Sequence, residues 1–224
     1  MAMAEPLATR IDSPQSDARL TLWQWLSPAF PTGAFAYSSG LEWAMAQGAV
    51  GRDTLADWLA DWVQFGGGWT DAVLLGLALR PEADLAALDT LGRALCLSAE
   101  RLAETLDQGT AFALTVAALN GTDQPPAILP VAVARATAPL GLPVAEVIAS
   151  FLHGMTANQI HAAVRFLPMG QVDAQRILAG LHPVLTQVAH QAATAGPDDL
   201  GTAAFGAELA AFAHETMETR MFRT

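Results

Sequence analysis

The sequence has 224 residues, of which 52% are apolar and 15% are charged, and its 11 basic and 22 acidic residues give a net charge of −11 at pH 7. This apolar content excludes a chain that is disordered for lack of hydrophobic residues, and the length suffices for one or two domains with a buried core. A surface this negative repels phosphate backbones and anionic lipids, so we expect no nucleic-acid partner and no membrane partner.

Cysteine usage and the placement of apolar residues bear on the compartment. A single cysteine, Cys96, excludes an internal disulfide framework and any zinc site built from several cysteines. Residues 1–17 lack the basic start and apolar stretch of a signal peptide. The long uncharged stretches 20–41 and 177–197 contain prolines and polar side chains that lipid would leave unsatisfied. We therefore expect a cytoplasmic protein.

In chain order, residues 1–16 are broken by prolines, and we expect a flexible N-terminal tail. A helix is predicted from Asp17, and Ser27-Pro28 ends it because the residue before proline avoids the α region. Residues 39–42, Ser-Gly-Leu-Glu, have the spacing of a capping box, in which the serine and the glutamate satisfy free N–H groups at a helix start. That helix is expected to end at Gly48.

The middle of the chain continues with helical spacing. Asp53 is predicted to cap a helix with one apolar face. The triple glycine at 66–68 is expected to be a flexible connection to the next helix, which ends at Arg80-Pro81. Residues 85–116 predict either two helices or one long bent helix.

The second half begins with the clearest loop, residues 120–126, followed by a short helix. Apolar residues then form a stripe about six turns long over 144–166, and Pro168 and Gly170 end that helix. Two or three further helices reach the last residue. Because no segment alternates apolar and polar residues as a strand does, we predict an all-α, single-domain bundle of roughly eight to eleven helices over 17–224.

Nothing in the sequence predicts an active site. Without lysine the chain has no Walker-type phosphate loop, and the glycines at 66–68 lack the preceding strand of a phosphate cradle. Cys96 lies between leucines on an apolar helical face, where a small buried hydrophobe is the favoured interpretation. No serine lies in a G-x-S-x-G turn. We expect a protein that is not an enzyme and needs no cofactor.

Histidines are the remaining candidates for metal binding. His153 and His161 are eight positions apart on one predicted helix, about 12 Å, which is too far for a shared ion. His214 and Glu218 are one turn apart, but their segment lacks the second histidine of the H-E-x-x-H zinc pattern. We expect no metal ligand, and we favour a position on the helix surface or at a partner contact for His214.

Three stretches are unusual for a plain core. Residues 28–37 place three aromatic side chains in a loop stiffened by proline and glycine, which suits a contact surface; alternatively, Phe30 and Tyr37 turn inward and plug the bundle. Residues 168–176 carry amides and charges, either for a partner or as a helix stop followed by a new first turn. Residues 220–224 have two arginines around a phenylalanine, a pattern suited to docking, whereas an ordinary terminus frays.

The same stretches resemble the signatures of one protein family. Residues 27–38 (SPAFPTGAFAYS), followed by Gly-Leu-Glu at 40–42, are similar to the opening signature of the UreF family of urease accessory proteins. Residues 162–178, with Leu-Pro-Met-Gly-Gln at their centre, resemble its second signature. The closing motif matches His-Glu-Thr at 214–216 and Arg-Met-Phe-Arg at 220–223. The matches follow the family's order along the chain.

The resemblance implies an all-α homodimer, without catalysis of its own, that helps to assemble the nickel centre of urease. It implies bridging of a UreD/UreH-type accessory protein and the nickel-carrying UreG GTPase, in a complex that acts on the urease apoprotein. Phe35 and Arg220 match family positions in the GTPase contact, and residues 214–222 are expected to become ordered on partner binding. The implied partner-binding residues are Phe30, Pro31, Gly33, Phe35, Tyr37, Ser38, Glu42, Gln171, Asp173, His214, Glu215, Arg220, Phe222 and Arg223.

Composition also favours a homodimer, through helices in the middle of the chain, because large exposed apolar patches mark interfaces. Two other functions stay open. One is a nickel-binding carrier that uses His214 and other histidines of its own. The other is a helical enzyme with an unrecognised site. Calorimetry with nickel on the isolated protein tests the first of these.

Overall fold

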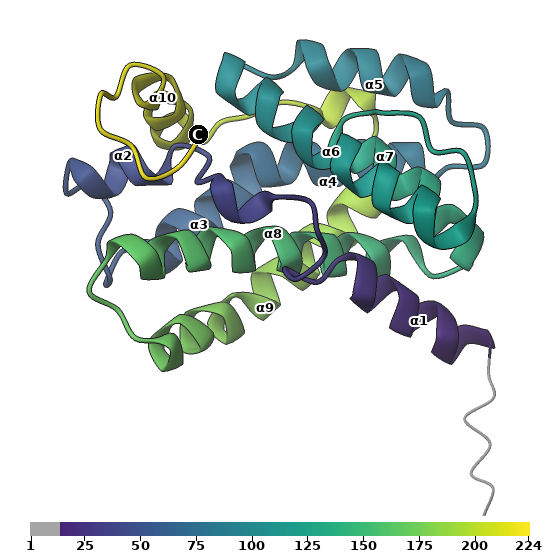
Figure 1. The fold of residues 1–224 in the computed structure, drawn as a ribbon, viewed down its shortest axis with the longest axis horizontal. Coiled ribbons are helices and arrows are strands. Elements are labelled where there is room, and N and C mark those ends of the chain that lie inside the picture. Colours follow the sequence, from purple (N-terminus) through teal and green to yellow (C-terminus); the bar gives the residue numbers. More distant parts are fainter. Residues whose placement is uncertain (1–13) are drawn as a thin grey trace, which may run out of the picture.

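The computed structural model describes residues 14–224, which form ten α-helices and three short 3₁₀-helices and contain no strand (Figure 1). The α-helices are α1 (Pro14–Trp25), α2 (Leu41–Ala46), α3 (Leu55–Phe65), α4 (Gly67–Ala78), α5 (Leu85–Ala94), α6 (Ala99–Asn120), α7 (Leu129–Thr137), α8 (Val144–Phe166), α9 (Gln171–Thr194) and α10 (Phe205–His214). The 3₁₀-helices are η1 (Ala34–Ala36), η2 (Ala138–Leu140) and η3 (Pro197–Asp199). The predicted all-α class and helix count are confirmed. No helix in this range has the length and apolarity that crossing a bilayer requires.

The core is built around α4, which is apolar on all sides rather than along one face. This helix packs against α3, α7, α8 and α9, and Ala72, Val73 and Leu75 are completely buried. The long helices α8 and α9 are antiparallel neighbours that flank it (Figure 1). The buried apolar residues form one contiguous core.

The N-terminal boundary differs from the prediction. α1 begins at Pro14, so residues 14–16 of the expected tail are helical. Residues 1–13 of that tail lie outside the described residues. α1 ends at Trp25, before the stop expected at Pro28.

Two side-chain caps decide the helix count in the middle of the chain. Residues 85–116 belong to two helices rather than one bent helix. Asp84 caps α5 by accepting hydrogen bonds from two backbone N–H groups, and Ser98 caps α6 by accepting from that of Arg101 at 3.0 Å. Each cap replaces hydrogen bonds that the first helical turn lacks, so each helix begins independently.

The triple glycine forms a tight corner rather than a flexible connection. Only Gly66 separates α3 from α4, which begins at Gly67. A β-carbon on Gly68 would lie 2.9 Å from the Cα of Val63. The missing side chains therefore allow α3 and α4 to pack closely. A connection that was merely flexible would not need this close packing.

Cys96 follows α5 and is partly exposed, whereas the sequence predicted a small buried hydrophobe. Its thiol lies 3.4 Å from the carbonyl oxygen of Gly92. Burial raises the pKa of the thiol, and the Arg101 guanidinium partly offsets that rise. A thiol kept protonated is a poor nucleophile, so the environment gives Cys96 no reactive character.

Candidate partner-binding site

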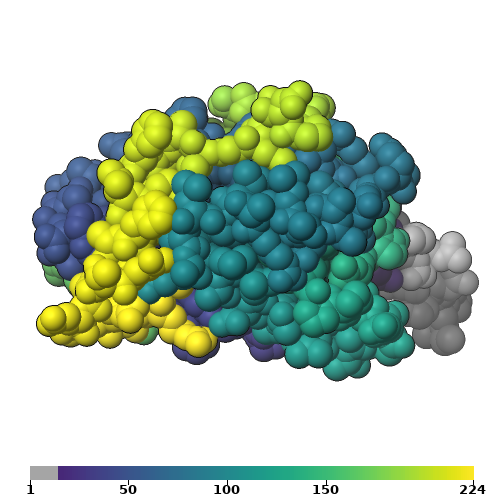
Figure 2. Space-filling model, turned by 90° about the horizontal axis from the view of Figure 1, so that it is seen from above, coloured from purple at the N-terminus to yellow at the C-terminus, as the bar shows by residue number. Residues whose placement is uncertain are grey.

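The tail (residues 215–224) returns from α10 and lies against the aromatic loop (residues 27–38). Figure 2 shows the C-terminal residues, in yellow, along the surface against the teal middle of the chain. The Ser38 backbone N–H and hydroxyl both donate to the Thr224 backbone oxygen, at 2.8 and 2.5 Å. The Arg223 N–H donates to the Ala36 oxygen at 2.7 Å. The structure thus joins the first and third unusual stretches of the sequence.

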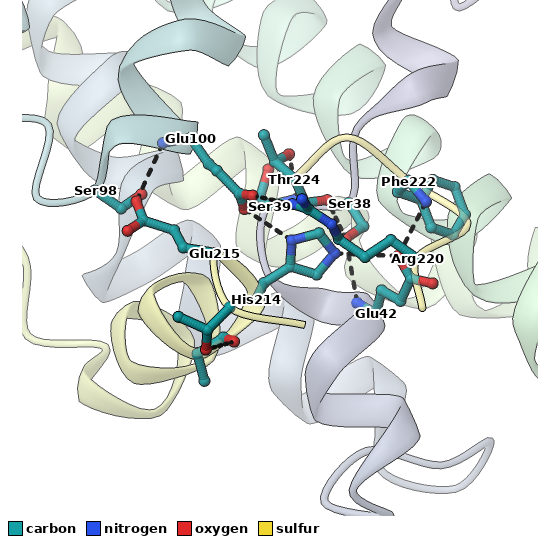
Figure 3. Close-up of polar contacts among 12 residues, drawn as sticks. Ser38, Ser39, Glu42, Ser98, Glu100, His214, Glu215, Arg220, Phe222 and Thr224 are labelled. Carbon is teal, nitrogen blue, oxygen red and sulfur yellow. Dashed lines mark hydrogen bonds and ion pairs between the residues drawn. The ribbon is translucent and has the colours of Figure 1, made fainter. Parts of the chain in front are cut away.

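Glu42 holds the tail from α2 (Figure 3). Its side chain is buried and accepts hydrogen bonds from the backbone N–H groups of Met221 (2.6 Å) and Phe222 (3.0 Å). The predicted capping box is therefore wrong, because the Glu42 carboxylate turns away from its own helix start. There the hydroxyl of Ser38 accepts from the Glu42 N–H at 3.2 Å instead.

Gly40 allows α2 to approach α10. It has a φ of 81°, a conformation that favours glycine. A β-carbon at this position would lie 2.5 Å from the backbone nitrogen of Ala211 in α10. This close approach brings Glu42 and His214, one on each helix, into contact.

His214, at the end of α10, is completely buried. Its Nδ1 lies 2.7 Å from Glu100 and its Nε2 lies 3.1 Å from Glu42. The helix-surface position predicted for it is wrong, because the tail and α2 cover the ring. Both ring nitrogens face carboxylates, so neither is free to bind a metal ion in this conformation.

Glu100 and Glu215 connect the tail to the start of α6. Glu215 accepts from the backbone N–H groups of Ala99 (2.7 Å) and Glu100 (3.3 Å), which belong to the first turn of α6. A carboxylate at a helix N-terminus is favourable because the free N–H groups carry partial positive charge. The Arg220 guanidinium pairs with Glu100 at 2.5 Å and remains on the surface.

Arg165, near the end of α8, clamps the aromatic loop and the tail together. Its guanidinium carbon lies 4.4 Å from the centre of the Phe222 ring, and its Nη1 donates to the Phe35 backbone oxygen at 2.7 Å. Phe222 is only 4% exposed. A cation over an aromatic face is attractive, so one side chain fixes both segments.

Of the three aromatic residues of the loop, two turn inward and one forms part of the surface, so each interpretation of the loop holds for some of them. Phe30 is buried and packs against Phe112, with ring centres 5.4 Å apart. Tyr37 is also buried, whereas Phe35 is 73% exposed. Pro31 is exposed as well. Two aromatics therefore anchor the loop and the third is presented to solvent.

Tyr37 anchors the loop to α6 by a polar contact. Its hydroxyl donates to Asp107 at 2.7 Å, and the Arg223 guanidinium lies 3.2 Å from the same hydroxyl. Burial and then the Asp107 carboxylate raise the pKa of Tyr37 to about 12. Gly33, with a φ of 75°, starts the short helix η1 that leads to this residue.

Gln171 and Asp173 lie at the start of α9, apart from the contacts between loop and tail. Gln171 is exposed. Asp173 pairs with Arg52 at 2.8 Å and with Arg176 at 3.0 Å. These contacts match the alternative interpretation of this stretch, a helix stop followed by a new first turn.

A largely buried ion cluster on α4 and α6 contacts the site. Arg101 pairs with Asp71 and lies 3.8 Å from Glu104. Burial raises the pKa of both carboxyl groups, and the guanidinium offsets part of that rise. Ser39 donates to Glu104 at 3.0 Å, and the Thr224 hydroxyl lies 3.5 Å from it. The tail thus reaches the charged interior of the bundle.

Sequence reasoning missed several residues that build the site. Glu100, Glu104 and Asp107 lie on α6, and each contacts the loop or the tail. Of the three, only Glu104 falls in a segment with a weaker match to the family, Glu-Thr-Leu at 104–106, and none was predicted to bind a partner. Arg165 occurs in the second signature, but nothing marked it as a contact residue. Acidic side chains at one-turn spacing on α6 were the available signal, although a solvated helix face has the same pattern. Within residues 14–224, no group of three metal-ligating side chains is arranged to hold an ion.

Comparisons with known proteins agree with the resemblance. The sequence model of the UreF family matches residues 50–182, more than half of the chain. A urease accessory protein UreF of Paracoccus denitrificans (strain Pd 1222) is 60% identical over 207 residues, which cover 92% of this chain and 96% of the relative. That of Cereibacter sphaeroides (strain ATCC 17029 / ATH 2.4.9) is 57% identical over 211 residues, covering 93% and 100%. That of Rhodopseudomonas palustris (strain TIE-1) is 45% identical and covers 100% of this chain and 98% of its own.

Proposed function

This chain belongs to the UreF family of urease accessory proteins, and from that premise we propose that it is a non-catalytic chaperone subunit. It bridges a UreD/UreH-type protein and the UreG GTPase for GTP-dependent nickel insertion into the urease apoprotein. The observation that carries this proposal is the joined loop and tail, which surround their buried anchors with exposed side chains suited to protein recognition.

Phe35 is the aromatic anchor of the proposed GTPase contact. Its backbone is held by Arg165 while its ring points away from the core, at 73% exposure. A large aromatic side chain on a fixed backbone loses little entropy when it binds, and such residues carry much of the energy of interfaces.

Arg220 is the proposed polar anchor. One nitrogen of its guanidinium pairs with Glu100, and the side chain stays partly exposed. Arginine presents five donors in a planar fork, so donors remain for a carboxylate of the partner. On the same tail, Glu215 is partly exposed, and Met221 and Arg223 are exposed.

That residues 214–222 become ordered on partner binding stays a prediction, but in this structure the tail already has contacts of its own. It is already docked on its own domain, because Glu42, Ser38 and Arg165 supply the contacts that a partner was expected to supply. A preformed surface avoids the cost of ordering ten residues on association. The proposed role of the tail is therefore to display Arg220 rather than to fold around a partner.

A homodimer is part of the same proposal. Large apolar side chains remain exposed on several helices of residues 14–224, among them Leu114 and Leu119 on α6, in the middle of the chain where the dimer contact is predicted. Exposed apolar surface of this kind favours association. Light scattering of the purified protein at micromolar concentration is expected to give the mass of two chains, and a monomer would contradict this part of the proposal.

Affinity capture tests the bridging function. The tagged chain is co-expressed with the UreD/UreH-type protein and the UreG GTPase, and the captured partners are quantified. Arg220→Ala and Phe35→Ala are each expected to reduce GTPase capture by about thirtyfold, as for the loss of a hot spot worth about 2 kcal/mol. Arg19→Ala, which removes a partly exposed ion pair with Glu146 between α1 and α8, is the matched control. Unchanged capture by both site variants would refute the proposal.

The alternative of a nickel carrier that works through His214 has no support in the geometry. That ring is enclosed and both its nitrogens are paired with carboxylates. The bridging function needs no metal ligand in this chain. Among the described residues, no acid, base and nucleophile are arranged in a way that would support the alternative of an enzyme with an unrecognised site.

A further inference from the structure

Two histidines from different helices meet in a hollow that the proposed function does not use. His153 on α8 and His182 on α9 have ring centres 5.6 Å apart. The hollow has a volume of about 580 Å³ and is also lined by Trp23, Leu26, Ser150 and Thr186. We propose that His153 and His182 together bind one divalent transition-metal ion of the Ni²⁺, Cu²⁺ or Zn²⁺ class.

The separation of the two rings suits a shared ion. Imidazole nitrogens bind zinc at about 2.1 Å, which places each ring centre about 3.2 Å from the metal. Two rings on one ion at an angle of about 110–120° then have centres about 5.2–5.5 Å apart. The observed 5.6 Å is close to this range, so the spacing of the rings is compatible with one shared ion. His153 and His161, considered from the sequence, lack this proximity because they share one helix.

The two rings are free to take a ligand. Both residues are exposed. Within the described part of the chain, neither ring has a hydrogen-bonded partner, and their contact is with each other. A neutral imidazole nitrogen is the form in which histidine binds a metal ion.

The surroundings define the kind of metal site. Among the described residues that line the hollow, none besides the histidines is titratable. An ion held there has two nitrogen ligands and completes its shell with water, for which the hollow has room. Two imidazoles select Ni²⁺, Cu²⁺ or Zn²⁺ over Ca²⁺ and Mg²⁺, which prefer oxygen ligands. Only two protein ligands make the site exchangeable rather than structural, and the net charge of −11 favours cation approach.

Isothermal titration of the untagged full-length protein with NiCl₂, and separately with ZnCl₂, tests the site. One ion per chain is expected to bind, and His153→Ala and His182→Ala are each expected to weaken that binding by about tenfold or more. His190→Ala removes another exposed histidine of α9 and is the matched control. Since all three positions are exposed, circular dichroism should show unchanged helix content.

Copper provides a second readout. The electron paramagnetic resonance spectrum of the protein with one equivalent of Cu²⁺ is expected to show two nitrogen ligands, and one in either site variant. The proposal is overturned if the wild-type protein binds no metal, or if its affinity is the same in both site variants or falls equally in His190→Ala. It does not rest on the bridging function: Arg220→Ala is expected to bind nickel normally, and the two histidine variants are expected to capture the GTPase normally.

Discussion

Glu42 and His214 lie 172 positions apart in the sequence and meet at 3.1 Å in the interior of the protein. The carboxylate of Glu42 also accepts two backbone N–H groups of the tail. One side chain on α2 therefore holds both the end of α10 and the segment that follows it. This contact explains why the tail, which carries the proposed anchor Arg220, has a defined position.

Glu42→Gln is expected to release the tail. The amide offers one acceptor oxygen in place of two, so the backbone N–H of Met221 or of Phe222 loses its acceptor, at a cost of about 1–3 kcal/mol. Amide hydrogen exchange at Met221 and Phe222 should accelerate by about tenfold or more. Glu146→Gln, at a partly exposed ion pair on α8, is the control. Equal protection of Met221 and Phe222 in both variants would contradict the role of Glu42 in holding the tail.

Phe222→Ala is expected to expose the tail to protease. The ring is buried beneath Arg165, and removing a buried phenylalanine side chain costs about 3 kcal/mol. Because the chain has no lysine, trypsin cleaves only at arginines, and cleavage after Arg220 reports directly on release of the tail. Its rate should rise by about tenfold or more.

The same substitution at an exposed position provides the control for that experiment. Phe205 on α10 is 74% exposed, so Phe205→Ala should leave the cleavage rate after Arg220 unchanged. Equal acceleration in the two variants would show that general loosening of α10, rather than loss of the Phe222 anchor, releases the tail.

Local patterns predicted most of the helices. The stripe over 144–166 coincides with α8, because an apolar face at helical spacing is specified within a few turns. The capping box at 39–42 was wrong for a tertiary reason. Its glutamate obtains better partners in the tail than at its own helix start, so a distant segment outweighs the local preference.

The sequence predicted several residues of the site but not the contacts between them. The aromatic loop and the tail were each recognised, yet their contact depends on pairs such as Ser38 with Thr224, separated by 186 positions. No pattern within a window of the sequence reports such a pair. The ring contact between His153 and His182 was missed for the same reason, because it requires the antiparallel register of α8 and α9.

Titration of Tyr37 with pH tests whether the aromatic loop is anchored on α6. Tyr37 is the single tyrosine of the chain, and its pKa is about 12 in the folded protein, against about 10 in an unfolded chain. Since the folded pKa is raised, the contribution of the phenol to stability is fully present below pH 10 and is lost as the pH rises through about 12. Tyrosinate absorbance after a rapid pH jump should show this midpoint.

Asp107→Asn separates the two causes of that shift. Burial is the largest single cause of the raised pKa, followed by the hydrogen bond to Asp107 and by its charge, so the variant midpoint should fall but stay above 10. A wild-type midpoint at the ordinary tyrosine value would show that Tyr37 is solvated and that the aromatic loop is not anchored on α6.

Gly76 in α4 tests how closely the core helices approach. A β-carbon there would lie 2.7 Å from the carbonyl oxygen of Ala192 in α9, a backbone atom that cannot move aside alone. Gly76→Ala is therefore expected to lower the free energy of unfolding by about 2 kcal/mol, measured by urea denaturation. Gly180 in α9 has no atom within 4 Å of a built β-carbon, so Gly180→Ala should raise it by about 0.5–1 kcal/mol through helix propensity. If both variants were stabilised, α4 and α9 would have to be further apart than they are in this structure.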